Sequence, residues 1–413
     1  MKKNGRQKHG NRAAVWTVSA LLLCFFLLGG VLYFTRGQTP GEVPEGDNAG
    51  AGEASKEESV SPPALEPESA PPLPTTEELL MEYIQTMSLE EKVGQMFLIR
   101  CPEGKPVNGV RKFQPGGMIF FARDFAEKGS DEVQAEIASY QEVSRVPMLT
   151  AVDEEGGEVN RISRYSQYRA EPFASPQQLY ASGGWERIAA DTVEKCKLLA
   201  SLGLNVNMAP VCDMAADSSS YIYRRTFGAG PAKTSEYVRR VVTTMTEQNT
   251  GSVLKHFPGY GGNLDTHQGF SVDGRPYSEF ESSDFLPFQE GIEAGAGAVL
   301  VSHNIVECMD AELPASLSPE VHRVLREELK FEGVIMTDDL VMQAITNAYG
   351  AEEAAVLAVK AGNDMLCCTN YKVQIPSVIA AVETGEISEA RIEESVLRVL
   401  LWKHQLGLVE VSK

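Results

Sequence analysis

The sequence predicts an α/β fold, a (β/α)8 TIM-type barrel, and three observations lead to this prediction. Eight short apolar runs recur between residues 95 and 368, and each is short enough to be a buried strand. Amphipathic stretches of helical period separate most of these runs, and polar residues close five consecutive ones. Strands that alternate with helices in this way are typical of a barrel whose active site forms at the carboxyl ends of its strands.

The expected strands and helices follow one another along the body of the chain. The eight strands are expected at residues 95–100, 116–121, 147–153, 204–210, 252–256, 298–303, 333–339 and 364–368. Helical periodicity is clearest at residues 130–145, 234–249 and 318–330. Ser318 is expected to cap the last of these helices, because a serine directly before a proline is a common start of a helix.

The amino-terminal segment, residues 1–36, is expected to be a cytoplasmic tail with a transmembrane anchor. It holds six basic residues and no acids, and its apolar run at residues 13–34 is long enough to cross a bilayer. The basic leading flank predicts a cytoplasmic amino terminus. A cleaved signal peptide is the alternative, but the run ends without a small-x-small cleavage site.

Residues 37–76 are expected to form a disordered linker, and residues 77–410 the catalytic barrel. The linker is rich in Pro, Glu, Gly, Ala and Ser and has almost no large apolar residue, so it cannot build a core. The barrel would then be held outside the cytoplasm by a single-pass anchor in the cell membrane. Cleavage of the anchor would instead give a secreted form.

The charge balance excludes some partners. The chain has 37 basic and 57 acidic residues, and six of the basic ones precede the linker, which leaves the exported part with a net charge of about −26. Nucleic acid is therefore not an expected partner. The seven cysteines show neither disulfide nor metal-binding spacing. We expect a monomer without a metal or other cofactor.

The loop that follows the fifth expected strand carries chemistry of its own. It reads KHFPGYGGNLDTH from Lys255 to His267 and holds two of the six histidines of the chain. Histidine has an ordinary pKa near neutrality, so Asp265 and His267 can form a proton-transferring pair. Such a short motif alone more often belongs to an incidental surface turn, so other strand ends must support it.

Polar residues at the other strand ends give that support. They are Asp153 and Glu154 after the third strand, Asn207 and Asp213 beside the fourth, Lys255 and His256 at the fifth, Ser302, His303 and Asn304 at the sixth, and Asp338 and Asp339 at the seventh. A single acid at a strand end is usually a cap or turn residue. Polar residues at five consecutive ends point to a functional site at one mouth of the barrel.

Several blocks of the sequence resemble glycoside hydrolase family 3. In order, they are MSLEEKVGQMFLI from Met87, DEEGGEVNR from Asp153, NVNMAPVCD from Asn205, RTFG from Arg225, KHFPGYGGNLDTH, and GVIMTDDLVM from Gly333. The resemblance spans residues 77 to 410, and the D-x-H motif is similar to that of the β-N-acetylhexosaminidase branch. Bacterial enzymes of this branch recycle or trim peptidoglycan.

The resemblance implies a catalytic set. Asp338 stands where the family keeps its nucleophile, which forms a covalent glycosyl-enzyme that water later resolves with retention of configuration. Asp339 would be structural. His267 stands at the general acid/base, and Asp265 at the carboxylate that orients its imidazole. A histidine suits both proton transfers because its pKa lies near neutrality.

The resemblance also implies a sugar pocket. Asp153 matches the acid that holds ring hydroxyls, Arg161 and Arg225 match two arginines of the pocket, and Lys255 with His256 matches the pair that grips the non-reducing sugar. The implied activity is removal of terminal N-acetylglucosamine from peptidoglycan-derived glycans. The chain ends soon after the barrel, so the acid/base is expected in the loop rather than in a second domain.

Three positions depart from the family pattern. The loop has Tyr260 where histidine is usual and Gly262 where an acid is frequent, and Glu158 stands where a basic residue is common. None of these positions has a predicted catalytic role. Because of these departures, the sequence does not predict the closed conformation of the loop or the substrate preference beyond the first sugar.

Other classes of function would require other residues. A metal-dependent hydrolase would need an H-x-H pair at the first strand, but the only histidine before residue 256 is His9. An inactive cell-wall glycan-binding protein would be expected to lack the nucleophile or the dyad, and both are present. A β-glucosidase-like specificity and a phosphorolytic outcome remain the alternatives. A neutral histidine repels incoming phosphate less than a carboxylate does.

Overall fold

The computed structural model describes residues 74–411, except for residues 105–106, 216, 263–270 and 369. Eight strands form one parallel sheet in the order β11-β9-β7-β6-β3-β2-β1-β12. A parallel bridge from Met336 to Met365 joins the two outer strands. The predicted α/β fold is therefore confirmed in this part of the chain as a nearly closed eight-stranded barrel.

Each expected strand segment coincides with one strand of the barrel or contains it, except that β7 is one residue longer at each end than the expected 252–256. The strands are β1 (Phe97–Arg100), β2 (Gly117–Phe120), β3 (Leu149–Val152), β6 (Val206–Asn207), β7 (Gly251–Phe257), β9 (Ala298–Val301), β11 (Val334–Thr337) and β12 (Leu366–Cys368). Almost all of their residues are buried, as expected for parallel strands that are covered on both faces. Two short pairs lie outside the barrel: antiparallel β4 (Glu154–Gly156) with β5 (Val159–Asn160), and parallel β8 (Val272–Asp273) with β10 (Ile305–Val306).

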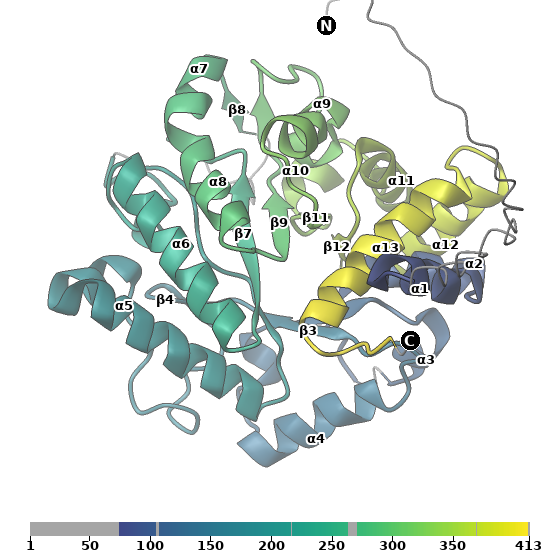
Figure 1. Ribbon diagram of the computed structural model, residues 1–413, viewed down its shortest axis with the longest axis horizontal. Coiled ribbons are helices and arrows are strands. Elements are labelled where there is room, and N and C mark those ends of the chain that lie inside the picture. The colour runs from purple at the N-terminus through teal and green to yellow at the C-terminus, as the bar shows by residue number, and fades with distance from the viewer. Residues whose placement is uncertain (1–73, 105–106, 216, 263–270, 369, 412–413) are drawn as a thin grey trace, which may run out of the picture. The chain divides into compact units, whose positions relative to one another are not determined.

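The helices surround the strands (Figure 1). They are α1 (Thr76–Gln85), α2 (Leu89–Gln95), α3 (Val107–Phe113), α4 (Ser130–Gln141), α5 (Pro176–Ser201), α6 (Pro231–Glu247), α7 (Tyr277–Glu279), α8 (Phe285–Glu293), α9 (Pro319–Arg323), α10 (Gln343–Thr346), α11 (Ala351–Ala361), α12 (Tyr371–Glu383) and α13 (Glu389–Gln405). Helix α13, in yellow, lies beside α1 and α2, in purple, so the last helix of the body covers its first two.

The predicted cap of α9 is confirmed, but the helix is not continuous. The Ser318 hydroxyl accepts a hydrogen bond from the Val321 amide at 3.3 Å, and Pro319 occupies the first turn. A π-helical turn, η6 (Val324–Glu328), then replaces regular α-helix over the second half of the expected segment. Helix α4 ends at Gln141, four residues before the expected 145, because the chain turns there to enter β3.

The interior of the barrel is apolar below its carboxyl-terminal mouth. Alternate residues of every barrel strand point inward and pack together, among them Leu98, Ile119, Val206, Leu300 and Met336. Two further apolar clusters fill the space between the strands and the surrounding helices. The barrel is thus a packed core, which leaves its mouth as the place for polar side chains.

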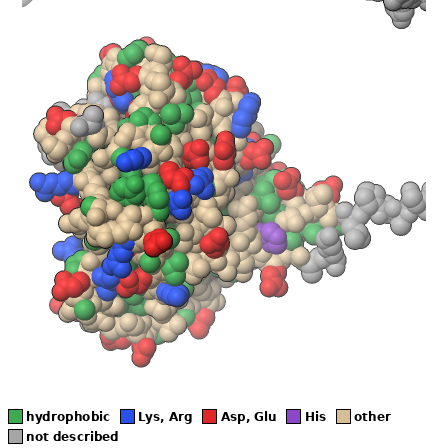
Figure 2. Space-filling model, turned by 60° about the vertical axis from the view of Figure 1, so that its left-hand side comes forward, with side chains coloured by type: hydrophobic (Ala, Val, Ile, Leu, Met, Phe, Trp, Pro, Cys, Tyr) green, Lys and Arg blue, Asp and Glu red, His purple; other side chains and the backbone are tan. Residues whose placement is uncertain are grey.

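The predictions for the amino terminus fall on residues that the structure does not describe. No described helix is long and apolar enough to cross a membrane. The anchor expected at residues 13–34, and the linker up to residue 73, lie outside the described residues, and both stay predictions. On the face of the body shown in Figure 2, acidic and basic side chains are interspersed, and basic ones do not gather in one large patch.

Candidate active site

A cavity of about 510 Å³ opens at the carboxyl ends of the barrel strands. Every predicted site residue that the structure describes lines it: Asp153, Arg161, Arg225, Lys255, His256 and Asp338. These residues come from segments up to 185 positions apart in the sequence, between Asp153 and Asp338. The other two predicted residues, Asp265 and His267, lie outside the described residues.

Lys255 is the buried cation at the floor of this cavity. It lies on β7, and its Nζ is 2.7 Å from Asp153 Oδ1 and 2.6 Å from Glu155 Oε1. Burial by itself would lower the pKa of Lys255, but the two carboxylates outweigh burial and raise that pKa above its usual 10.5. The ammonium group is therefore charged at neutral pH and held in one position.

Arg225 is the second fixed cation, and it ends the short helix η2 (Tyr223–Arg225). Its Nε and Nη2 donate to the two oxygens of Glu155 at 3.0 and 2.8 Å, which is a bidentate pair. Burial by itself would raise the pKa of Glu155, but Arg225 and Lys255 together hold that pKa well below its usual value. Glu155 is thus an ionised, buried carboxylate that aligns two cations of the predicted sugar pocket.

His256 is oriented by a second acid, Asp213. Its Nδ1 lies 2.7 Å from Asp213 Oδ2, and its backbone N–H donates to the same oxygen at 3.1 Å. Arg225 Nη2 lies 3.2 Å from His256 Nε2, and a guanidinium can only donate. The hydrogen must then be on Nδ1, where it points to Asp213. Asp213 therefore sets both the ring orientation and the tautomer of His256.

Arg161 is positioned by the hairpin of β4 and β5. The buried carboxylate of Glu154 accepts backbone N–H groups from Arg161 at 2.9 Å, Ile162 at 2.8 Å and Ser163 at 3.1 Å. These bonds fold the chain after β5 back toward β3. As a result, Arg161 Nη2 reaches to 3.5 Å from Asp153 Oδ2 at the cavity.

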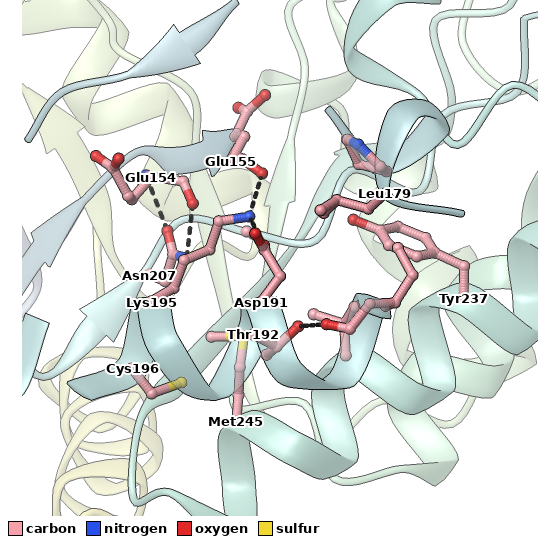
Figure 3. Close-up of a pocket in the computed structure, with 14 residues that line it drawn as sticks. Glu154, Glu155, Leu179, Asp191, Thr192, Lys195, Cys196, Asn207, Tyr237 and Met245 are labelled. Carbon is pink, nitrogen blue, oxygen red and sulfur yellow. Dashed lines mark hydrogen bonds and ion pairs between the residues drawn. The ribbon is translucent and has the colours of Figure 1, made fainter. Parts of the chain in front are cut away.

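The chain after β3 is also held from behind, as Figure 3 shows. Lys195 of α5 donates to the backbone oxygen of Glu155 at 2.8 Å and pairs with Asp191 at 2.7 Å. Asn207 of β6 accepts from the Glu154 amide at 3.0 Å and donates to its carbonyl at 3.1 Å. These groups surround a cavity of about 20 Å³, which is the space of about one water molecule. They fix the backbone from which Asp153 and Glu155 project.

Asp338 follows β11 directly and lines the cavity from the opposite side of the barrel mouth. Its amide donates to Val301 of β9 at 3.0 Å, and its Oδ1 accepts from the Asp339 amide at 2.8 Å. Asp339 Oδ1 accepts from Val341 at 3.1 Å, and the Asp339 carbonyl lies 3.1 Å from His303 Nε2. These contacts fit the structural role expected of Asp339. They also place the His303 ring against the backbone of the turn that carries Asp338 and Asp339.

The described start of the D-x-H loop is anchored at the sugar site. Gly259 has φ +128°, and a Cβ atom there would lie 2.3 Å from Asp284 Oδ1, so only glycine fits without rearrangement. Tyr260, which departs from the family pattern, is buried and donates its amide to Asp213 Oδ1 at 2.8 Å. Its ring stands edge-on to His256 at 5.1 Å. One acid, Asp213, thus joins the loop to His256.

Two important residues had no predicted role. Glu155 was hidden between two other acids in the run DEEGG, where sequence alone does not say which carboxylate faces inward. The sequence indicates Asp213 only as a polar residue beside a strand. The charge of Lys255 and the geometry of Arg225 and His256 depend on these two acids. In the described part of the chain, no cluster of three or more His, Cys, Asp or Glu side chains could hold a metal ion.

Comparisons with known proteins agree with the site. A family model described as the glycosyl hydrolase family 3 N terminal domain matches residues 88–401. A protein named Beta-hexosaminidase from Hydrogenovibrio crunogenus is 32% identical over 290 residues, which cover 67% of this chain and 78% of that protein. Another of the same name, from Stenotrophomonas maltophilia, is 33% identical over 282 residues, which cover 67% and 82%.

A solved structure is similar over most of the body. It is a glycoside hydrolase family 3 beta-N-acetylglucosaminidase from Paenibacillus sp., with a TM-score of 0.73 and 28% identity over 79% of this chain. This chain spans 65% of the length of that protein. The family model covers more than half of the chain, and the relatives exceed 30% identity over most of their length. The chain therefore belongs to glycoside hydrolase family 3 and is a glycoside hydrolase.

Proposed function

We propose that this protein is a retaining exo-β-N-acetylglucosaminidase that removes terminal N-acetylglucosamine by a double displacement. The observation that carries the proposal is the meeting of Asp338 with Asp153, Lys255, His256 and Arg225 at one cavity. A carboxylate that faces an array of fixed polar groups is the arrangement that attack on a bound sugar needs. The names of the relatives support N-acetylhexosamine as the sugar class.

In the first step, a carboxylate oxygen of Asp338 attacks the anomeric carbon of the sugar. The bond to the glycosidic oxygen breaks, and His267 gives that oxygen a proton, so the leaving group departs neutral. The product is a glycosyl ester on Asp338 with the opposite anomeric configuration. Asp265 beside His267 would stabilise the imidazolium that must be present before this transfer.

In the second step, water replaces the aspartate. His267, now neutral, takes a proton from the water as its oxygen attacks the anomeric carbon. The ester bond to Asp338 breaks, and the sugar leaves with its original β configuration. The two proton transfers regenerate the imidazolium and the carboxylate, which closes the cycle.

Sugar recognition would depend on cations that are already fixed. Lys255 and Arg225 are held by Asp153 and Glu155, so their hydrogen-bond donors need little reorganisation when a sugar binds. Their charges are mostly balanced by the same acids. Such a pocket suits an uncharged sugar with several hydroxyl groups, and Asp153 adds acceptors for those hydroxyls.

We further propose that the enzyme works outside the cytoplasm on peptidoglycan-derived glycans, held by the segment at residues 13–34. The basic flank before this apolar run supports the orientation, and the Pro- and Glu-rich stretch after it supports a tether. Fractionation of cells that express the full-length chain tests this part. Recovery in the soluble cytoplasmic fraction would contradict it.

An assay with paired substrates tests the activity. The full-length chain is given 4-nitrophenyl β-N-acetylglucosaminide and the matching β-glucoside, with and without inorganic phosphate. We expect at least about 100-fold higher kcat/KM on the N-acetyl substrate, with no need for phosphate, because a hydrogen-bonding site strongly rejects an analogue that lacks its partner. Comparable rates on the glucoside would favour a β-glucosidase-like specificity. Release of a sugar phosphate would favour a phosphorolytic enzyme.

Variants make the same assay a test of the residues. Asp338→Ala and His267→Ala should each lower kcat by about 100-fold or more. Asp217→Ala is the matched control, because Asp217 is exposed and its carboxylate accepts from the Ser219 amide at 2.8 Å. Binding of N-acetylglucosamine without turnover of either substrate would indicate a glycan-binding protein instead.

A further inference from the structure

Arg275 lies two residues after the end of β8 and follows the D-x-H pair in the sequence. Its Nε donates to Asp273 Oδ1 at 3.0 Å and its Nη2 donates to Asp273 Oδ2 at 2.8 Å, which is a bidentate pair. The backbone N–H of Arg275 also donates to Asp273 Oδ1, at 3.0 Å, and Asp273 is buried. The guanidinium is therefore fixed to the segment that follows Asp265 and His267.

The same guanidinium supports the segment that precedes the pair. A Cβ atom on Gly261 would lie 2.7 Å from Arg275 Cζ, so the backbone of Gly261 packs directly against the guanidinium. Gly261 has φ +54°, which glycine adopts without strain. The carbonyl oxygen of Gly259 lies 3.5 Å from Arg275 Nη2. Arg275 thus contacts both described flanks of the D-x-H loop.

A second buried acid and an aromatic ring hold Arg275 in this position. Asp284 is 1% exposed, and its Oδ2 accepts from Arg275 Nη1 at 3.0 Å. The guanidinium lies over the Phe280 ring, with Cζ 4.3 Å from the ring centre. Burial by itself would lower the pKa of Arg275, but Asp273 and Asp284 outweigh burial and raise that pKa. The cation is therefore always charged, and its donors have fixed directions.

The flank that follows the pair is in turn fixed to the barrel. In the pairing of β8 with β10, the Ile305 amide donates to the Ser271 carbonyl at 2.9 Å, and the Glu307 amide donates to the Asp273 carbonyl at 3.0 Å. Strand β10 comes shortly after barrel strand β9. Among the described residues, Arg275 is not one that lines the cavity of about 510 Å³. Its contacts therefore fit support of the loop rather than contact with the sugar.

We propose that Arg275 is a positioning residue that ties the two flanks of the D-x-H loop together and thereby sets the position of His267 at the leaving oxygen. This rests on the proposed function, in which His267 protonates that oxygen. Because both flanks contact one fixed guanidinium, the two ends of the loop are held at a fixed separation. General acid catalysis requires hydrogen-bond reach, and a misplacement of about 1 Å can lower a rate by about 100-fold.

The test compares two leaving groups, because only a poor one needs a proton. A dinitrophenol departs as a stable anion, whereas phenol departs slowly unless an acid protonates its oxygen. For the full-length chain, the measured quantity is the ratio of kcat/KM on 2,4-dinitrophenyl β-N-acetylglucosaminide to that on the phenyl glycoside. We expect Arg275→Gln to raise this ratio by about tenfold or more. Damage to the fold or to sugar binding would instead lower both values together.

A second readout comes from the dinitrophenyl substrate alone. A displaced His267 would also slow the attack of water on the glycosyl-enzyme, because it removes the proton from that water. The intermediate then accumulates, so kcat and KM of Arg275→Gln should fall together on this substrate, by about tenfold or more. A rise in KM at unchanged kcat would instead indicate a weakened sugar pocket and would contradict the proposal.

Further variants separate positioning from general damage. Arg275→Lys keeps the charge between the two acids but not the planar donors, so it should give an intermediate ratio. Gly261→Ala leaves Arg275 and both acids unchanged but pushes the start of the loop away from the guanidinium, so it should also raise the ratio. Arg323→Gln is the matched control, because it removes an arginine that pairs with Glu320 on the surface of α9. It should leave the ratio unchanged.

His267→Ala separates this inference from the proposed function, and it should raise the ratio most. If His267→Ala raises the ratio but neither Arg275→Gln nor Gly261→Ala does, the inference is overturned and the proposed glycosidase mechanism is not. A ratio that does not respond to His267→Ala would overturn the acid/base assignment, and this inference with it. Because Arg275 is proposed to act through His267, adding Arg275→Gln to His267→Ala should not raise the ratio further. A further rise would also overturn the inference.

Discussion

Arg225 and Glu155 meet through two parallel hydrogen bonds, from Nε to Oε2 at 3.0 Å and from Nη2 to Oε1 at 2.8 Å. The same carboxylate lies 2.6 Å from Lys255 Nζ. One buried acid therefore fixes two of the cations to which sugar binding is assigned. Removal of one partner from such a buried network leaves the remaining charges uncompensated.

Glu155→Gln should damage both stability and activity. The neutral amide keeps the size of the side chain but cannot neutralise Arg225 and Lys255, so we expect a loss of about 3 kcal/mol in the free energy of unfolding at pH 7. We also expect kcat/KM on the aryl substrate to fall by about 100-fold. Urea denaturation and steady-state kinetics measure the two effects, and Glu247→Gln, at an exposed position at the end of α6, is the control.

The pH dependence of that stability loss has a definite sign. The pKa of Glu155 is lower in the folded protein than in the unfolded chain, so its stabilising contribution is present above the unfolded value of about 4.3. The contribution is lost as pH falls below that value toward the folded pKa. The stability gap between Glu155→Gln and the unmodified chain should therefore narrow below about pH 4. A gap that widens in acid would contradict this assignment.

Asp213→Asn should impair catalysis more than folding. An amide can replace only part of what Asp213 accepts from His256 and Tyr260, so the ring loses its fixed tautomer and the start of the D-x-H loop loses an anchor. Partners of this kind typically contribute about 10- to 100-fold to activity. We expect a fall of that size in kcat/KM, with a smaller change in Tm. Unchanged kinetics would show that neither function depends on Asp213.

Lys403 predicts a pH effect far from the active site. Its side chain is fully buried in α13, and Nζ donates to Gln95 Oε1 at 2.7 Å. Burial lowers the pKa of Lys403 to about 7. Because the unfolded chain keeps the proton up to about pH 10.4, the stability of the folded state should rise as pH increases from 7 toward 10.

The variant Lys403→Met should remove this dependence. Between pH 7 and pH 9, the unmodified chain should gain about 2 kcal/mol in the free energy of unfolding relative to the variant. Chemical denaturation at the two pH values measures the difference. Lys360→Met, at a half-exposed lysine that pairs with Glu386, is the control and should show no such change. Parallel behaviour of Lys403→Met and the unmodified chain would contradict the lowered pKa.

The barrel could be predicted from the sequence because its strands are buried on both faces. Each strand therefore reads as a short apolar run, such as VIMT in β11, and polar residues such as Asp338 appear where the run ends. The carboxyl ends of parallel strands meet at one mouth of the barrel, which is why Asp153, Lys255 and His256 could be predicted to lie there together. The D-x-H pair and the amino-terminal anchor lie outside the described residues, so those assignments stay predictions.

The sequence shows which residue types stand at the strand ends, but it does not predict the direction in which each side chain points. Asp153, Glu154 and Glu155 are consecutive acids, yet one lines the cavity, one accepts three backbone amides and one pairs with buried cations. Glu154 and Glu155 are successive residues of β4, so their side chains point to opposite faces, and the course of this strand is set by tertiary contacts.

The most direct measurement is azide rescue of Asp338→Gly. The space left by the carboxylate admits azide on the side from which Asp338 is proposed to attack, so the variant should regain turnover of an activated aryl β-N-acetylglucosaminide. The product should be the α-configured N-acetylglucosaminyl azide, because displacement occurs only once. Full hydrolytic activity of Asp338→Gly without azide, or a β-configured azide, would contradict the nucleophilic role of Asp338.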